Sequence, residues 1–276
     1  MNIKLIALDM DGTTLLNDYM SISQRTRKVL EEAIARGIHV VPSTGRILGQ
    51  LPESVTSIPG INYAVTSNGA VVTNLNSNEV ISSNYLGAGS VKKIITTLSR
   101  RKLFCEIYHQ GQSYGEMRYF EMIGERNDLS KDLIAFIRSK AKEVENVLDF
   151  AIEHASEIEK INIPLLSDKN LRVLWQKFSQ IHGVTLTKAI VNNIEVNHRS
   201  VNKGAGLKQL CRILKLEPTN VMAIGDSDND LRMLQFAGLG VAMGNASADV
   251  KAVANHVTLP FDEDGVANAI EKFVLV

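Results

Sequence analysis

The chain has 276 residues, of which 45% are hydrophobic, so it is long enough to bury a substantial core and to form two domains. Its 30 basic and 30 acidic side chains cancel, which leaves no net field to attract nucleic acid or an anionic membrane surface. No apolar run approaches the roughly 20 residues that span a bilayer, and the first residues lack the pattern of a secretory signal. We therefore expect a cytoplasmic protein with no nucleic-acid or membrane partner.

Four segments repeat one pattern, in which a short apolar strand is followed by a small or polar cluster and then by the start of a helix. In chain order they read IKLIALDMDGTT, IHVVPSTGRI, VMAIGDSDNDLRML and LGVAMGNASADV. The nearly continuous apolar strands are typical of a parallel sheet covered on both faces. Two amphipathic helices are expected, from Ser23 to Gly37 and from Asn202 to Leu216. The alternation predicts an α/β fold with a doubly wound, mostly parallel, Rossmann-like core sheet.

The stretch between the second and third segments follows another pattern. From about Tyr85 to about Asn193 it contains helical and strand-like runs, and none of these strands ends in a comparable polar cluster. The stretch is long enough to be a domain of its own. We therefore expect an inserted α+β domain at residues 85–193, and a core assembled from residues 1–84 and 194–276.

The polar clusters lie at the carboxyl ends of the predicted strands, where parallel sheets place their ligand sites. Asp9 and Asp11 follow the first strand and could act as a nucleophile and as a proton donor and acceptor, respectively. Attack of a carboxylate on a phosphate dianion is opposed by charge repulsion, so the site also needs a divalent cation and hydrogen-bond donors. The other clusters supply these groups.

Three residues offer groups for an anion: the Thr44 hydroxyl, the Arg46 guanidinium, and the Lys203 ammonium at the start of a helix. Thr44 could instead cap a following helix, and Arg46 could lie on a helix surface. The SNGA run at Ser67–Ala70 predicts a hairpin turn whose backbone could line the crevice. Oxygen ligands and supporting partners suited to Mg²⁺ come from Asp226, Asn229 and Asp230.

In this order, DMDGTT, STGR, Lys203 in NKGAGL, and GDSDND resemble the motifs of the haloacid dehalogenase (HAD) superfamily of hydrolases. The resemblance is to its Cof-like phosphatase branch, which carries an α/β cap of type IIB between the second and third motifs. It continues in GNASADVKAVA and DEDGVANAI, whereas residues 85–193 match mainly in length and position. The cap is expected to close over the site, exclude water and select the leaving group.

The resemblance implies that Asp9 forms an aspartyl-phosphate and that Asp11 acts first as an acid and then as a base on the hydrolytic water. It also implies a Mg²⁺ ion held by the Asp9 carboxylate, the Asp11 backbone carbonyl and the Asp226 carboxylate. Asp230 would orient the lysine or metal-bound waters. The groups expected around the phosphoryl oxygens are those of Gly12, Thr44, Arg46, Lys203 and Asn229.

The expected function is Mg²⁺-dependent hydrolysis of small phosphorylated metabolites, with sugar phosphates as the first substrate class and phosphorylated cofactors such as flavin mononucleotide or pyridoxal phosphate as the second. A phosphomutase of the same superfamily is an alternative, because it would use the same Asp9 and Asp11 but return the phosphoryl group to the substrate. A noncatalytic metabolite sensor is another, although its usual signature is loss of the nucleophile or the lysine, and both are present. The oligomeric state stays open.

Overall fold

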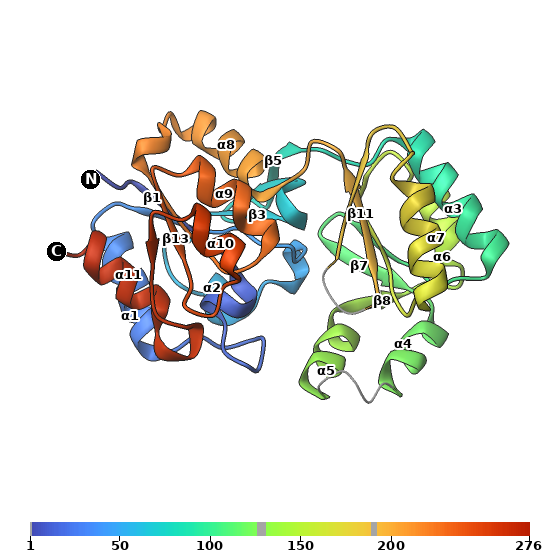
Figure 1. The fold of residues 1–276 in the computed structure, drawn as a ribbon, viewed down its shortest axis with the longest axis horizontal. Helices are drawn as coiled ribbons and strands as arrows, with labels where there is room; N and C mark the ends of the chain where they lie inside the picture. The colour runs from blue at the N-terminus through green and yellow to red at the C-terminus, as the bar shows by residue number, and fades with distance from the viewer. Residues whose placement is uncertain (1, 126–130, 189–191) are drawn as a thin grey trace. The chain divides into compact units, whose positions relative to one another are not determined.

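A computed structural model describes residues 2–125, 131–188 and 192–276. The chain divides into two compact units (Figure 1). Unit 1 consists of Met1–Arg46, Leu51–Ser83 and Asn202–Val276, and unit 2 consists of Ile47–Gln50 and Asn84–Val201. Each unit has its own sheet and its own hydrophobic core.

Unit 1 is built on a parallel sheet with the strand order β14-β13-β12-β1-β2. The chain runs from β1 to its neighbour β2 and returns only later to β12 on the other side of β1. The carboxyl ends of β1 and β12 therefore form a topological switch point, where open α/β sheets bind ligands. The strands are β1 Leu5–Leu8, β2 His39–Pro42, β12 Val221–Gly225, β13 Leu239–Ala242 and β14 His256–Val257.

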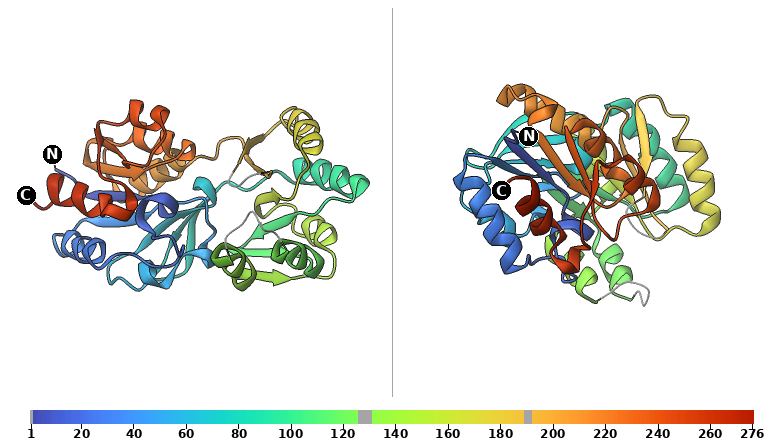
Figure 2. Two further views of the ribbon diagram at one scale, coloured as in Figure 1. Left: turned by 60° about the horizontal axis from the view of Figure 1, so that its bottom comes forward. Right: turned by 60° about the vertical axis from the view of Figure 1, so that its left-hand side comes forward.

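Helices cover both faces of this sheet. Successive strand side chains point to opposite faces, and Leu5 and Ala7 share a core cluster with residues of α8, α9 and α10. Helices α1 and α11 pack against each other on the opposite face (Figures 1 and 2). The doubly wound α/β core is thereby confirmed. The helices are α1 Gln24–Ala35, α8 Lys203–Leu214, α9 Leu231–Phe236, α10 Ala248–Val253 and α11 Gly265–Phe273.

A small antiparallel sheet, β3-β4-β5, extends unit 1 beyond β2. An isolated parallel bridge between Ser43 and Val65 connects it to the end of β2. Ser67–Gly69 forms the turn between β3 and β4, with φ positive at all three residues, so the predicted hairpin turn is confirmed. The short helix α2 Glu53–Thr56 precedes it, and the strands are β3 Tyr63–Thr66, β4 Val71–Asn74 and β5 Glu79–Ser83.

Unit 2 contains a mostly antiparallel sheet with the order β10-β11-β9-β6-β7-β8. Its main core lies between this sheet and α3, α6 and α7, which stack on one face (Figures 1 and 2). Helices α4 and α5 contribute to a second, smaller core. The strands are β6 Glu106–His109, β7 Gln112–Gly115, β8 Ala141–Glu143, β9 Ile158–Ile163, β10 Val184–Thr187 and β11 Ile194–His198. The helices are α3 Ala88–Arg101, α4 Met117–Gly124, α5 Lys131–Lys140, α6 Val147–Glu153 and α7 Asp168–Phe178.

The boundaries of the units differ from the predicted domain boundaries in two places: Ile47–Gln50 belongs to unit 2, and unit 2 ends later than predicted. Strand β11 pairs antiparallel with β9 and β10, so it completes the sheet of unit 2 instead of starting the return to the core. Unit 2 therefore extends to Val201 rather than to residue 193. The predicted inserted range 85–193 also includes residues 126–130 and 189–191, which lie outside the described residues.

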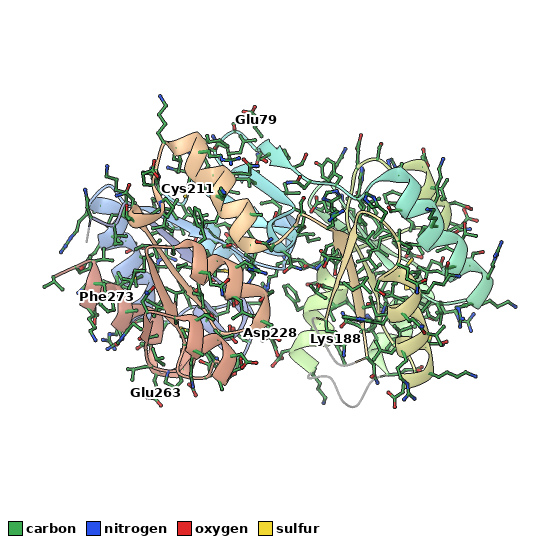
Figure 3. All side chains as sticks on the ribbon, turned by 45° about the horizontal axis from the view of Figure 1, so that its top comes forward. Glu79, Lys188, Cys211, Asp228, Glu263 and Phe273 are labelled. Carbon is green, nitrogen blue, oxygen red and sulfur yellow. The ribbon has the colours of Figure 1, made fainter. Side chains whose placement is uncertain are left out.

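Two further sequence features have a plain structural outcome. Cys105 and Cys211 are buried free thiols, the first in unit 2 and the second on α8 of unit 1 (Figure 3). Among residues 2–125, 131–188 and 192–276, no helix combines the length and the apolar character that a membrane crossing requires.

Candidate active site

The end of β1 places Asp9 at the switch point of the sheet. The Asp9 N–H donates to the Ile224 carbonyl at 3.0 Å, which continues the pairing of β1 with β12 by one residue. The chain then turns over Met10–Thr14, with non-helical backbone at Asp11 and Gly12, and the Thr14 hydroxyl donates to the Asp9 carbonyl at 2.6 Å. This turn ends the strand and fixes the Asp9 backbone beside the end of β12.

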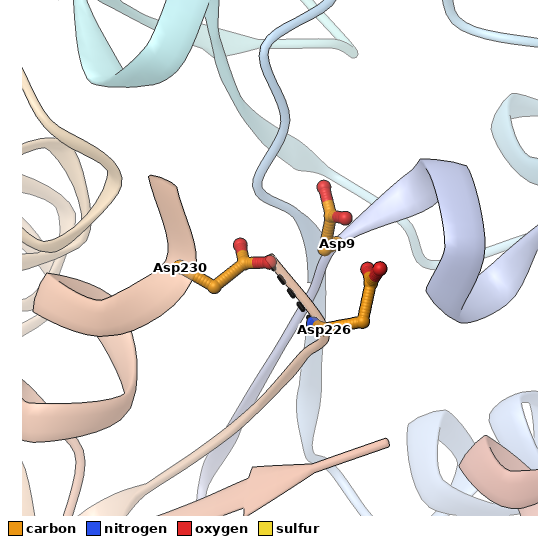
Figure 4. Close-up of side chains that lie close together, drawn as sticks. All are labelled: Asp9, Asp226 and Asp230. Atoms are coloured by element: carbon orange, nitrogen blue, oxygen red, sulfur yellow. Dashed lines mark hydrogen bonds between the residues drawn. The ribbon is translucent and has the colours of Figure 1, made fainter. Parts of the chain in front are cut away.

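Three carboxylates converge there. Asp226 directly follows β12, and Asp230 lies one turn further, where α9 begins. One carboxylate oxygen from each of Asp9, Asp226 and Asp230 lies within 4.8 Å of the others (Figure 4). Asp9 and Asp230 are buried, whereas Asp226 is partly exposed. The cluster is therefore enclosed on the side of the sheet and accessible beside Asp226.

Lys203 is fully buried and connects two of these acids. Its ammonium donates to Asp9 Oδ1 at 2.5 Å and to Asp230 Oδ1 at 2.7 Å. Lys203 is the first residue of α8, and Asn202 caps that helix by accepting the Ala205 N–H at 2.8 Å. The first residue of α8 thus places a positive charge beside Asp9, the nucleophile predicted from the sequence.

The second oxygen of Asp230 organises the loop after β12. Asp230 Oδ2 accepts the backbone N–H groups of Asp226 and Ser227, both at 3.0 Å. Because its other oxygen accepts from Lys203, both Asp230 oxygens have protein partners. Asp230 therefore holds Lys203 and the loop at Asp226 in place.

The cluster carries more negative than positive charge. Burial raises the pKa of Asp9 well above its usual range; the Asp230 and Asp226 carboxylates raise it further, while Lys203 acts in the opposite direction. Burial also raises the pKa of Asp226, against a hydrogen bond from the Thr13 hydroxyl. For Lys203, burial alone would lower the pKa, but Asp230 and Asp9 together raise it. Three carboxylates facing one ammonium would be stabilised by additional positive charge.

A divalent cation fits this donor set. Mg²⁺ prefers carboxylate oxygens, together with water and phosphate oxygens. Asp9 and Asp226 could supply such ligands, whereas Asp230 already uses both oxygens for Lys203 and for backbone N–H groups. The chemistry of the residues therefore matches the predicted metal set at Asp9 and Asp226.

Gly12 lets the first loop approach Asp226. Its φ is +76°, and a Cβ at this position would lie 2.6 Å from Asp226 Oδ2. Thr13 donates to Asp226 Oδ1 at 2.8 Å, and Asn245 donates to the Gly12 carbonyl at 2.9 Å while its own Oδ1 accepts the Phe261 N–H at 3.1 Å. Gly12, predicted as a phosphate-binding residue, thus also has a packing role beside Asp226.

Asp11 and Arg46 form a second pair. Arg46 Nη2 lies 2.5 Å from Asp11 Oδ1, and Nε lies 2.8 Å from Asp11 Oδ2, so the contact is bidentate. Arg46 also donates to the Tyr19 carbonyl at 3.0 Å. The sequence offered a phosphate contact or a helix surface for Arg46. The structure instead buries its side chain on Asp11, and only a 3₁₀ turn, Leu48–Gln50, follows it.

Thr44 and Asn229 lie in loops connected by the turn after β3. The Thr44 hydroxyl accepts the Arg46 N–H at 3.1 Å, which is a local turn rather than a cap of an α-helix. Asn229 donates to Asn68 Oδ1 at 3.2 Å and accepts from the Ser227 hydroxyl at 2.7 Å. The Asn68 N–H donates to the Thr44 carbonyl at 3.0 Å. Asn68 therefore joins the two loops.

Sequence reasoning missed several of these contributors. The hydroxyl of Thr13 follows the DMDG run directly, so its place beside a strand end was the available signal. The Asn-Gly dipeptide at residues 68–69 signalled a turn and gave no indication of a contact with Asn229. No local signal indicated the contact of Asn245 with Gly12. The missed residues are Thr13, Asn68 and Asn245.

Comparison with known proteins adds an independent line of argument. Residues 6–270 match the family model of haloacid dehalogenase-like hydrolases. The chain is 34% identical over 278 residues to the 5-amino-6-(5-phospho-D-ribitylamino)uracil phosphatase YcsE of Bacillus subtilis (strain 168), which covers 99% of this chain and 97% of that relative.

Solved structures agree with the sequence comparison. A haloacid dehalogenase-like hydrolase from B. subtilis superposes with a TM-score of 0.82 at 27% identity, covering 99% of this chain and 100% of the other. A HAD subclass IIB sugar phosphatase has the same fold, with a TM-score of 0.81 at 23% identity over 99% of this chain and 100% of the other.

The α/β fold and the buried lysine and carboxylate cluster define a hydrolase of the HAD type. The chain belongs to the haloacid dehalogenase-like hydrolase family. The predicted family and the predicted enzyme class, a phosphatase, are confirmed.

Proposed function

We propose that this phosphatase hydrolyses small phosphorylated metabolites, with sugar phosphates as the first substrate class, in a Mg²⁺-dependent reaction through an aspartyl-phosphate on Asp9. The observation that carries the proposal is the buried contact of the Lys203 ammonium with Asp9 Oδ1 at 2.5 Å beside two further carboxylates. A buried carboxylate with a cation in direct contact suits attack on a phosphoryl group, because the cation offsets the charge repulsion. We place the reaction in the cytoplasm, where the two free cysteines would stay reduced.

In the first step an Asp9 oxygen attacks phosphorus, and the bond between phosphorus and the ester oxygen breaks. Asp11 gives its proton to that ester oxygen, so the alcohol leaves neutral. In the second step a water oxygen attacks phosphorus and passes a proton to Asp11, while the bond from Asp9 to phosphorus breaks. The products are inorganic phosphate, the free alcohol and the original Asp9 carboxylate.

Mg²⁺ would be held by the Asp9 carboxylate, the Asp11 backbone carbonyl and the Asp226 carboxylate, and it would neutralise charge on the phosphoryl oxygens. The three carboxylates that face the single Lys203 ammonium support a bound cation at this place. Asp230 would keep Lys203 and the Asp226 loop in position through the contacts of its two oxygens.

The phosphoryl oxygens would be held by hydrogen-bond donors from three loops. Lys203 contributes an ammonium already in contact with the nucleophile. The Thr44 hydroxyl keeps its proton for donation, since it acts as an acceptor toward the Arg46 N–H. Asn229 and the backbone of Gly12 lie in the loops beside Asp226. These assignments give each phosphate-binding residue a separate test by substitution.

The names of two similar proteins support the proposed substrate class. The name of YcsE specifies a phosphorylated ribityl chain, and the solved subclass IIB structure is a sugar phosphatase. Both names describe a phosphate on a polyhydroxylated carbon chain. Flavin mononucleotide carries a phosphorylated ribityl chain as well, so it belongs in the same test. We propose that unit 2 selects among such leaving groups.

The test measures phosphate release from sugar phosphates, sugar-alcohol phosphates, flavin mononucleotide, pyridoxal phosphate and p-nitrophenyl phosphate, with Mg²⁺ or with EDTA. Asp9→Asn should abolish release, and EDTA should abolish it in the wild type. The isosteric control is Asp249→Asn, which changes an exposed acid at the start of α10 and should keep full activity.

Rapid acid quenching followed by mass spectrometry should detect a phosphoryl group on the peptide that contains Asp9. Full activity of Asp9→Asn, or an inactive wild type on every compound, would refute the proposal. Isomerised sugar phosphate in place of free phosphate would identify a phosphomutase instead.

A further inference from the structure

We propose that Arg46 is a positioning residue for Asp11, and that unit 2 controls its position through the segment Ile47–Gln50. The inference rests on the proposed function, because it concerns how the acid of that reaction is placed. It changes the role predicted for Arg46 from a phosphate contact to a residue that acts through another side chain.

Arg46 contacts Asp11 through two hydrogen bonds, one to each carboxylate oxygen. Arg46 presents Nε and Nη2 to the two oxygens of Asp11, at 2.8 and 2.5 Å. Such bidentate contacts fix orientation as well as distance. The Arg46 side chain is 6% exposed and also donates to the Tyr19 carbonyl, whereas the Asp11 side chain is 43% exposed. Arg46, which is buried and held by the Tyr19 carbonyl, therefore restricts the rotamers of the more exposed Asp11.

Asp11 needs such a restraint for its proposed work. It must give a proton to the ester oxygen as the bond from phosphorus to oxygen breaks, and it must later take a proton from the attacking water. Both transfers require the carboxyl within hydrogen-bond reach of the reacting oxygen. Since a misplacement of about 1 Å can cost about 100-fold in rate, a residue that sets this position affects the reaction without touching the substrate.

The chain after Arg46 provides the connection to unit 2. Arg46 ends one segment of unit 1, and Ile47–Gln50 belongs to unit 2. The Gly49 N–H donates to the Gly111 carbonyl at 2.8 Å, in the hairpin between β6 and β7. Only Ile47 and Leu48 lie between Arg46 and Gly49, the residue that makes this hydrogen bond.

The contact leaves no space for a side chain on either glycine. A Cβ on Gly49 would lie 2.8 Å from the Gly111 carbonyl oxygen and 2.7 Å from Gln112 Nε2. Gly111 has a φ of +70°, and a Cβ there would lie 3.0 Å from Leu48 Cβ. Through this close contact the hairpin would hold the segment that follows Arg46, and thereby influence the position of Arg46 and of Asp11.

The test compares two substrates that depend differently on the acid. The alcohol of a sugar phosphate is a poor leaving group and needs a proton, whereas p-nitrophenolate leaves without one. Arg46→Lys keeps the positive charge but loses the bidentate contact with Asp11. Both substrates form the same aspartyl-phosphate, whose hydrolysis also uses Asp11, so the readout is the rate of the first step, measured as release of the alcohol or the phenol in a single turnover. Arg46→Lys should lower this rate by about tenfold to 100-fold on the sugar phosphate and by less than about threefold on p-nitrophenyl phosphate, with the half-saturating concentration nearly unchanged for both.

Two controls separate positioning from other roles. In an Asp11→Asn background, Arg46→Lys should have no further effect on the sugar phosphate, because the group it positions is gone. Arg25→Lys changes another bidentate pair, in which Arg25 contacts Glu271 on the surface of unit 1 at 2.6 and 3.2 Å. Arg25→Lys should leave the rates on both substrates at the wild-type level.

Gly111→Ala and Gly49→Ala test the connection to unit 2. Each should reproduce the selective loss on the sugar phosphate, although neither residue contacts Asp11. Circular dichroism and urea unfolding would establish that these variants are folded. If either folded variant keeps the wild-type ratio of the two first-step rates, control by unit 2 is wrong.

The proposed function and the inference fail in different ways. If Arg46→Lys lowers both first-step rates equally, or raises the half-saturating concentration for both substrates, Arg46 binds the phosphate and the positioning role is refuted. The phosphatase itself would then still release phosphate from both substrates in a Mg²⁺-dependent way. If the wild type hydrolyses neither substrate, the proposed function is refuted and the inference with it.

Discussion

Gly12 and Gly37 adopt the same unusual backbone conformation in different surroundings. Their φ values are +76° and +80°, a left-handed region in which a Cβ costs about 1–2 kcal/mol. A Cβ on Gly12 would also lie 2.6 Å from Asp226 Oδ2, whereas a Cβ on Gly37 would have no atom within 4 Å. Comparing alanine substitutions at Gly12 and Gly37 therefore separates the effect of backbone strain from the effect of displacing Asp226.

We expect Gly12→Ala and Gly37→Ala both to lose stability in urea unfolding, with the larger loss for Gly12→Ala because its Cβ also displaces Asp226. Only Gly12→Ala should also impair function, because it pushes Asp226 away from the proposed metal site. Changes beside a metal ligand typically cost about 10–100-fold in metal affinity or activity. Titrating phosphate release with Mg²⁺ should show a higher half-saturating concentration for Gly12→Ala and a wild-type value for Gly37→Ala. Wild-type titration of Gly12→Ala would argue against Asp226 as a metal ligand.

At the scale of single residues, the sequence indicated which side chains lie close together, but it did not indicate all of their hydrogen-bond partners. Asp9, Asp226, Asp230 and Lys203 follow strand ends or start a helix, so the topology alone brings them together. The contact between Asp11 and Arg46 was not predictable, because it depends on the path of the loop between them. Long-range hydrogen bonds from single asparagines leave no periodic trace in a sequence.

At the scale of elements, the glycines of α8 determine how Lys203 reaches the site. A Cβ on Gly206 would lie 2.6 Å from Val65 Cγ1 and 2.9 Å from the Gly69 Cα. The first turn of the helix therefore packs at backbone distance against β3 and the turn that follows it. This close approach places the Lys203 ammonium on Asp9 and Asp230.

Gly206→Ala should lower the free energy of unfolding, even though alanine favours a helix over glycine by about 1 kcal/mol. The matched control is Gly89→Ala in the first turn of α3, where a Cβ would meet nothing within 4 Å. That change should raise stability by about 0.4–1 kcal/mol. Urea unfolding of both variants measures the difference. A stabilised Gly206→Ala would show that α8 can shift without cost.

Element boundaries were predictable where a cap marks them. Ser23 accepts the Thr26 N–H at the start of α1, and Asn202 accepts the Ala205 N–H at the start of α8. Both predicted helices are therefore confirmed to within two residues at each end. Residues 194–198, predicted to belong to the core, instead form β11 in the sheet of unit 2. Four successive residues of β11 are buried, and burial alone does not say in which sheet a strand pairs.

At the scale of the whole molecule, the carboxylate cluster belongs to unit 1 alone. The pKa values of Asp9 and Asp226 are raised in the folded state, chiefly by burial. A carboxyl group with a raised folded pKa stabilises the fold below its unfolded pKa, near 4, and this contribution is lost as the pH rises through the folded pKa. Without metal, unit 1 should therefore become less stable as the pH rises above about 4.

Mg²⁺ should restore this stability, because it binds the ionised carboxylates of the folded state. A ligand at about 100 times its Kd stabilises the folded state by about 2.7 kcal/mol. Amide hydrogen exchange at pH 7.5, with Mg²⁺ or EDTA, should show slower exchange with Mg²⁺ in β1 and β12, but not in β6 and β9 of unit 2, which have a separate core. Asp226→Asn should abolish the difference. Equal protection of both sheets by Mg²⁺ would mean that the two units unfold as one, and no protection of β1 would argue against a metal at Asp9.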